Sequence, residues 1–106
     1  MSALEDDLVA QIRLVQLPAP EREVALIPGR RFRSDLCWRD RRLVCEVDGG
    51  TFISGRHARG PGITSDCEKQ NLLVLAGWRV LRVTTVHVRN GLALTWIEMA
   101  LQERTA

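Results

Sequence analysis

One strand pattern constrains the fold of this chain more than any other feature: the segment LVCEVD, Leu43–Asp48, followed by Gly49-Gly50. Three apolar residues alternate there with Val44 and the two acids Glu46 and Asp48. Because successive side chains of a strand point to opposite faces of a sheet, the pattern predicts one buried face and one face that carries both acids. Glycine pairs interrupt sheets, so we expect the strand to end directly after the second acid.

The rest of the chain predicts the order helix, three strands, helix, strand, helix. Ser2 and Glu5 form a capping-box pattern that opens the first helix, and Pro18 ends it. The other predicted elements are strands over Glu23–Ile27, Arg30–Trp38 and Trp78–Thr84, a helix over Ile63–Ala76 that Thr64 or Ser65 caps and Gly77 stops, and a last helix after Asn90-Gly91. An antiparallel meander followed by a crossover helix and a further strand indicates an α/β sandwich around a mixed sheet.

Length and composition favour one globular domain over residues 1–106. The chain is 45% hydrophobic and 26% charged, which argues against disorder. No apolar run approaches the ~20 residues that cross a bilayer, and the N-terminus is acidic where an export signal is basic. The three cysteines have no CxxC spacing, which favours a reducing compartment over a disulfide scaffold or a cysteine zinc site. We therefore expect a cytoplasmic protein, with no membrane partner.

Three carboxylates are predicted to converge. Glu46 and Asp48 leave one face of their strand, and Asp35 lies on the preceding strand across a short hairpin. Cross-strand neighbours lie roughly 5–8 Å apart, so their repulsion requires a proton or a cation. Hard oxygen ligands select magnesium, manganese or calcium. The alternative is that these are ordinary solvated residues of an exposed sheet face.

The basic residues point to a nucleic-acid partner. Of the 15 basic residues, 14 are arginines and one is Lys69. The planar guanidinium group of arginine can form two hydrogen bonds to phosphate oxygens. The excess of arginine over lysine is also compatible with a GC-rich genome. Arg56 and Arg59 flank His57 in a glycine-rich segment, where a histidine is either plain surface or a proton shuttle beside metal and phosphate. No phosphate-loop motif is present, so no nucleotide cofactor is expected.

Taken in order, these motifs resemble those of the PD-(D/E)XK nuclease superfamily. The matching residues are Asp35, then Glu46-Val47-Asp48-Gly49-Gly50, then Asp66 and the run from Gly77 to Arg82. Within the superfamily, the chain most resembles the small, very-short-patch-repair-like (Vsr-like) endonucleases of bacteria and phages. The resemblance covers most of the chain, from about Glu5 to Thr84. It implies a restriction-endonuclease-like α/β/α sandwich, in the order α-β-β-β-α-β-α, and a bacterial or phage-infected cytoplasm.

The resemblance also implies roles for individual residues. Asp35, Glu46, Asp48 and the helical Glu5 would hold Mg²⁺ or Mn²⁺. Asp48 departs from the family pattern, because the standard motif has lysine there. Lys69, on the following helix, is the candidate to replace the lysine of the standard motif. The alternative is that Lys69 is an ordinary surface lysine.

Neighbouring residues are candidates for further roles. Glu68 is a candidate ligand, and Gln70 a phosphate contact. Arg56, His57 and Arg59 would contact the nucleic acid, with His57 also in the catalytic set. Trp38 ends a strand and either packs in the core or faces DNA.

The expected function is a metal-dependent endonuclease that hydrolyses DNA phosphodiester bonds. So small a chain leaves little surface for sequence readout, so structure-selective cutting of branched or mismatched DNA, or a homodimer, fits better. Two alternatives remain: a non-catalytic nucleic-acid-binding accessory protein on the same fold, which the missing lysine favours, and a small ribonuclease.

Overall fold

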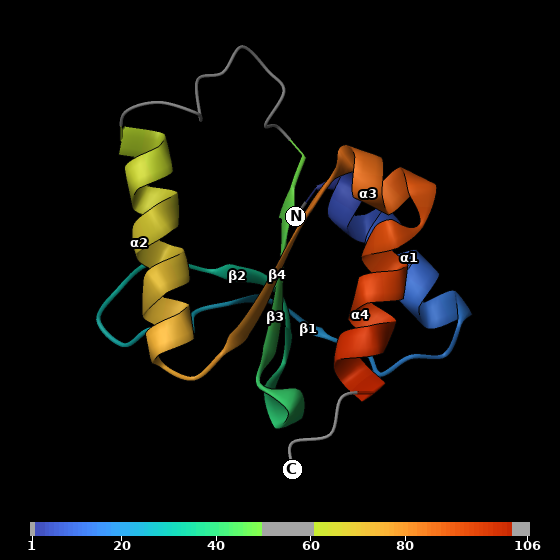
Figure 1. Ribbon diagram of the computed structural model, residues 1–106, viewed down its shortest axis with the longest axis horizontal. Coiled ribbons are helices and arrows are strands. Elements are labelled where there is room, and N and C mark those ends of the chain that lie inside the picture. Colours follow the sequence, from blue (N-terminus) through green and yellow to red (C-terminus); the bar gives the residue numbers. More distant parts are fainter. Residues whose placement is uncertain (1, 50–60, 103–106) are drawn as a thin grey trace.

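The computed structural model describes residues 2–49 and 61–102 of the chain. This part is an α/β fold in which a four-stranded mixed sheet, in the order β1-β2-β3-β4, lies between helices. Helix α2 covers one face of the sheet, and α1, α3 and α4 cover the other (Figure 1). No helix in these residues is long and apolar enough to cross a membrane.

Helix α1, Ala3–Leu14, begins as the sequence predicts. Ser2 has an extended backbone, and its hydroxyl accepts a hydrogen bond from the backbone N–H of Glu5 at 3.1 Å. The carboxylate of Glu5 bonds Arg22 instead of completing the capping box. Leu8 and Ile12, four positions apart, are fully buried, so one stripe of the helix packs on the sheet.

The first three strands form an antiparallel meander of β1 Glu21–Val24, β2 Ser34–Trp38 and β3 Leu43–Asp48. A short 3-10 turn, η1 Arg39–Arg41, joins β2 to β3. The bounds of β3 are those predicted. The other two strands differ from the prediction: β1 begins and ends earlier, and β2 begins only at Ser34.

Helix α2, Pro61–Leu75, crosses over to β4, Arg79–Thr84, which pairs parallel to β3. The helix begins at Pro61, so the predicted cap at Thr64 or Ser65 is wrong. Proline suits the first turn of a helix because the N–H groups of that turn have no partner within the helix, so the N–H that proline lacks is not missed. Gly77 follows the helix with a φ of +92°, which confirms it as the stop.

The C-terminal region contains two helices where one was predicted. Helix α3, Thr85–Asn90, starts at the end of β4, and Gly91 separates it from α4, Leu92–Gln102. Nδ1 of His87 accepts the backbone N–H of Thr84 at 3.0 Å, so this histidine caps α3. His87 therefore contributes to the local fold at the start of α3.

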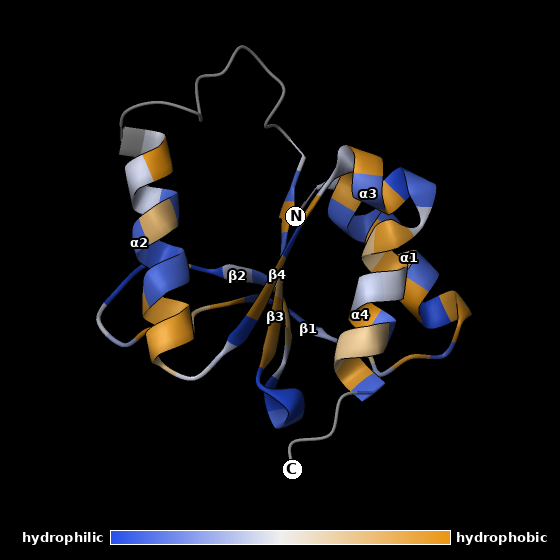
Figure 2. Ribbon diagram, in the orientation of Figure 1, coloured by the Kyte–Doolittle hydropathy of each residue, from blue (hydrophilic) through white to orange (hydrophobic). Residues whose placement is uncertain are grey.

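Each face of the sheet has its own buried cluster. Leu36, Leu43, Cys45 and Val83 pack against α1, α3 and α4, whereas Val44, Leu73 and Trp78 form a smaller cluster under α2. Helix α2 is hydrophobic at its C-terminal end and hydrophilic along its middle (Figure 2). The apolar contact is therefore confined to one end of α2, and polar side chains meet the sheet farther along.

Candidate active site

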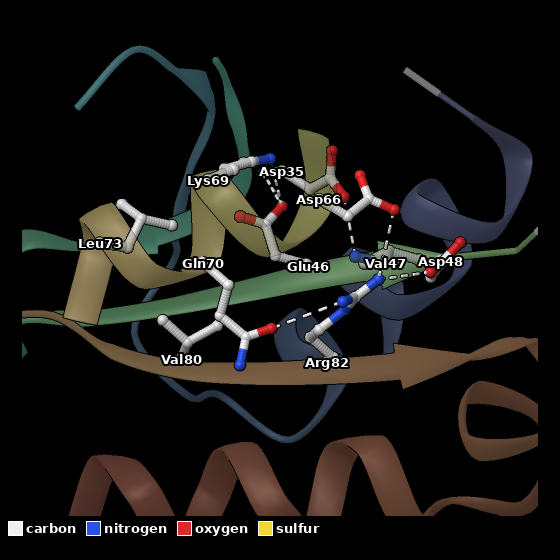
Figure 3. A pocket seen from close by; sticks show the side chains of 10 residues that line it. All are labelled: Asp35, Glu46, Val47, Asp48, Asp66, Lys69, Gln70, Leu73, Val80 and Arg82. Carbon is white, nitrogen blue, oxygen red and sulfur yellow. Dashed lines mark hydrogen bonds and ion pairs between the residues drawn. The ribbon is translucent and has the colours of Figure 1, made fainter. Parts of the chain in front are cut away.

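A pocket of about 160 Å³ lies between the polar middle of α2 and the face of the sheet that α2 covers (Figure 3). Asp35 of β2 and Glu46 of β3 line it, and Leu73 and Val80 contribute apolar walls. A cavity needs only about 10–15 Å³ to hold one water, so there is room for several waters or a hydrated ion.

Asp35 and Glu46 are joined through the backbone of their two strands. Oδ2 of Asp35 accepts the backbone N–H of Val47 at 2.7 Å, and Oε1 of Glu46 accepts the N–H of Asp35 at 3.3 Å. Burial, assisted by the neighbouring charge of Glu46, raises the pKa of Asp35 to about 6. The strand pairing thus holds two carboxylates side by side in a partly desolvated place.

Lys69 reaches this pair from α2. Its Nζ lies 3.0 Å from Oε1 of Glu46 and donates to the carbonyl oxygen of Arg33 at 2.5 Å. The other carboxylate oxygen of Glu46, Oε2, is buried and has no hydrogen-bond partner among the described residues. A buried oxygen without a partner is costly, so this atom is suited to a ligand.

A second group of charges lies farther along β3. Nη2 of Arg82, on β4, lies 2.8 Å from Oδ2 of Asp48 and 3.8 Å from Oδ2 of Asp66, on α2. Nη1 of Arg82 donates to Oε1 of Gln70 at 3.4 Å. Asp48 is therefore committed to an ion pair within this face of the sheet.

Asp35 also belongs to a further cluster of carboxylates, outside the group around Arg82. Carboxylate oxygens of Glu5, Glu23 and Asp35 all lie within 4.8 Å of one another. Glu5 is 3% exposed, its Oε1 is 3.1 Å from Nε of Arg22, and burial raises its pKa. Glu23 has a φ of +54°, a left-handed conformation that is unfavourable for a side chain of this kind.

Five of the residues predicted for the site come together. Asp35, Glu46, Asp48, Lys69 and Gln70 all line the one pocket. The predicted facing of β3 is confirmed, because Val44 packs in the cluster under α2 and Leu43 in the one on the opposite face. Glu5 approaches Asp35 rather than Asp48.

Other candidates lie elsewhere. Glu68 forms an ion pair with Arg30 and does not line the pocket. Trp38 is 3% exposed and its Nε1 donates to the carbonyl oxygen of Pro18, so it belongs to the core and the DNA-facing alternative is wrong. Arg56, His57 and Arg59 lie outside the described residues.

Three charged residues at the site had been assigned no role from the sequence: Asp66, Arg82 and Glu23. The first two had a signal in the sequence. Asp66 precedes Lys69 and Gln70 by three and four positions, which places all three on one face of a helix. Arg82 alternates with Val80, which faces α2. No local pattern points to Glu23.

Comparison of the chain with protein-family models, with curated proteins and with solved structures returned no match.

Proposed function

We propose that the protein is a metal-dependent endonuclease that hydrolyses phosphodiester bonds of DNA on a restriction-endonuclease-like α/β/α sandwich. One observation carries the proposal. Lys69 contacts one oxygen of Glu46, while the other oxygen of the same carboxylate is buried, unpartnered among the described residues, and lies in a pocket that Asp35 also lines. The order of the motifs in the sequence, which resembles that of the PD-(D/E)XK nucleases, supports the same function.

The donor set suits a divalent cation with oxygen ligands. Oε2 of Glu46 needs a partner. Oδ2 of Asp35 accepts from Val47, and its Oδ1 has no hydrogen bond to another of the described residues. Mg²⁺ and Mn²⁺ bind to one or two carboxylates and keep several waters, for which the pocket has room. A nearby cation would also counter the burial that raises the pKa of Asp35. Asp35 and Glu46 are therefore the residues proposed to hold the metal.

The chemistry divides between the cation and the protein. When bound, a divalent cation lowers the pKa of a coordinated water and polarises a phosphate oxygen. The ammonium group of Lys69 has three donors, of which two are directed to the carbonyl of Arg33 and to Glu46. Its third donor has no partner among residues 2–49 and 61–102, and we propose that it serves the attacking water or a phosphate oxygen. Lys69 would thereby supply the stabilising charge that a lysine at position 48 would provide.

The proposed substrate is DNA of unusual structure, such as branched or mismatched duplexes. The basic residues are nearly all arginines, and the contacts that an arginine makes with phosphate carry no sequence information. A homodimer that places one site on each strand is compatible with the same chemistry.

The test is an incubation with supercoiled plasmid, a branched DNA and an RNA, each with Mg²⁺, Mn²⁺ or EDTA. We expect metal-dependent cleavage of DNA that Glu46→Gln abolishes. The matched control is Glu98→Gln, which changes an exposed glutamate on α4 and should leave cleavage unaltered.

The same experiment separates the alternatives. Metal-independent binding of DNA without cleavage would identify a non-catalytic binding protein. Cleavage of RNA alone would identify a ribonuclease. Equal cleavage by the wild type and by Glu46→Gln would overturn the proposed site.

A further inference from the structure

The two basic side chains of the pocket, Lys69 and Arg82, form ion pairs with different carboxylates. Lys69 neutralises Glu46 at the end of the pocket where Asp35 lies. Arg82 lies between Asp48 of β3 and Asp66 of α2. Figure 3 shows the side chain of Arg82 rising from β4 towards β3, with its guanidinium near Asp48 and Asp66 and apart from Lys69.

The strand register explains why Arg82 reaches this place. In the parallel pairing of β3 with β4, Arg82 is the partner of Glu46, and Thr84 is the partner of Asp48. The arginine therefore starts level with the proposed metal ligand and extends towards the next acid on the same face. Its length and planar fork allow one nitrogen to contact carboxylates from two different elements.

The charge of the pocket fits one divalent cation. Four carboxylates and two basic side chains line it: Asp35, Glu46, Asp48, Asp66, Lys69 and Arg82. With all of them ionised, the net charge is −2, which a single Mg²⁺ or Mn²⁺ would neutralise. Without the guanidinium the net charge would be −3, with two carboxylates left facing each other around the position that Nη2 occupies.

We propose that Arg82 takes the place of a second divalent cation, so that this nuclease site holds a single metal ion. The inference rests on the proposed function, since it concerns the same pocket. It assigns Asp48 to the arginine rather than to a metal, although the sequence made Asp48 a candidate ligand. Asp48 is then a positioning residue: it holds a permanent positive charge in the pocket, on acids that would otherwise be free to bind a second ion.

The stoichiometry of Mn²⁺ binding tests this assignment without relying on cleavage. Calorimetric titration of the wild-type protein should find one Mn²⁺ per chain. Arg82→Gln should bind a second ion, because Asp48 and Asp66 are then free to act as ligands. Arg82→Lys, which keeps the charge, should still bind one. Arg89→Gln removes the same charge from an exposed position on α3 and should also leave the count at one.

Asp48→Asn provides a second test that does not depend on the folding of the Arg82 variants. It should keep the single Mn²⁺, whereas Glu46→Gln should lose it. Two ions in the wild type, one ion in a folded Arg82→Gln protein, or loss of the ion in Asp48→Asn would each overturn the role of Arg82 while leaving the metal site in place. No Mn²⁺ bound to the wild type would instead overturn the proposed function.

Discussion

The ammonium nitrogen of Lys69, on α2, lies 3.0 Å from Oε1 of Glu46, on β3, and this contact joins the crossover helix to the acidic face of the sheet. Both side chains are largely buried, at 20% and 12% exposure. A buried charge needs a partner, and each of these residues supplies the other's. Lys69 is the one lysine beside 14 arginines in the sequence, and its compact ammonium makes both of its contacts, to Glu46 and to the carbonyl of Arg33, from a single nitrogen.

Removing the ammonium of Lys69 should separate catalysis from metal binding. We expect Lys69→Met to keep the thermal shift caused by Mn²⁺ but to lower turnover by roughly 10²-fold or more, the scale of one lost electrostatic stabiliser. Lys69→Arg should recover little of this loss. Single-turnover cleavage assays measure the effect. Cleavage by Lys69→Met at the wild-type rate would show that the contact with Glu46 is only structural.

The proposed metal ligands should be visible in thermal unfolding. An ion that binds only the folded state stabilises it, by about 2.7 kcal/mol at a concentration of 100 Kd. We expect Mn²⁺ or Mg²⁺ to raise the Tm of the wild type and of Glu98→Gln by several degrees. Asp35→Asn and Glu46→Gln should fold but show no shift. Scanning fluorimetry measures these shifts in Tm. Equal shifts in all four proteins would place the ion elsewhere.

The raised pKa of Asp35 predicts a pH dependence of stability. Between the ordinary value of 3.8 and about 6, the folded state binds a proton more tightly than the unfolded state. The free energy of unfolding should therefore fall as pH rises through this window. Asp35→Asn cannot titrate, so its stability should increase relative to the wild type from pH 4 to pH 7 in EDTA.

Urea unfolding of both proteins at several pH values measures this difference. A constant difference across the window would show that the pKa of Asp35 is not raised. Metal affinity should follow the same group, because a proton and a cation compete for one carboxylate, and should weaken below about pH 6.

Replacing Trp38 should lower the stability of the fold and leave the affinity for DNA unchanged. Its ring is buried against α1 and α4, and its Nε1 donates to Pro18 at 2.7 Å. Trp38→Phe, which keeps most of the apolar contact, should lower the free energy of unfolding by about 1–3 kcal/mol because the carbonyl loses its partner. The affinity for DNA, measured by fluorescence anisotropy on the folded variant, should stay unchanged. A selective loss of DNA binding would return Trp38 to the DNA-facing role.

The arginines of the glycine-rich segment give a prediction that depends on the sequence alone. Arg56→Ala combined with Arg59→Ala should weaken DNA binding and reduce the slope of log K against log salt by about 0.9 for each lost phosphate contact. Binding titrations at several salt concentrations measure that slope. If the slope is unchanged, the phosphate contacts come from elsewhere. The next region to test is then the group of six arginines between positions 30 and 42 of the sequence.

The sequence by itself determined those features that depend on neighbours along the chain. The alternation in Leu43–Asp48 set the bounds and the facing of β3, because the side-chain period of a strand is two residues. Ser2 and Gly77 marked the start of α1 and the end of α2, because capping is local. The strand pattern also indicated Asp35 and Glu46 as members of one acidic cluster, and the resemblance to the PD-(D/E)XK nucleases added Lys69 to it.

Only the tertiary structure decided how carboxylates and cations are paired. Arg82 contacts Asp48 because β4 pairs with β3 in one particular parallel register. Glu23 approaches Asp35 because β1 pairs with β2 so that these residues lie across from each other, between Arg22↔Leu36 and Val24↔Ser34. Strand register depends on contacts between segments far apart in the sequence, and a shift by one residue would turn every side chain to the other face. The sequence could thus name Asp35, Glu46 and Asp48, but only the packing of α2 and β4 on β3 determined which cation each acid meets.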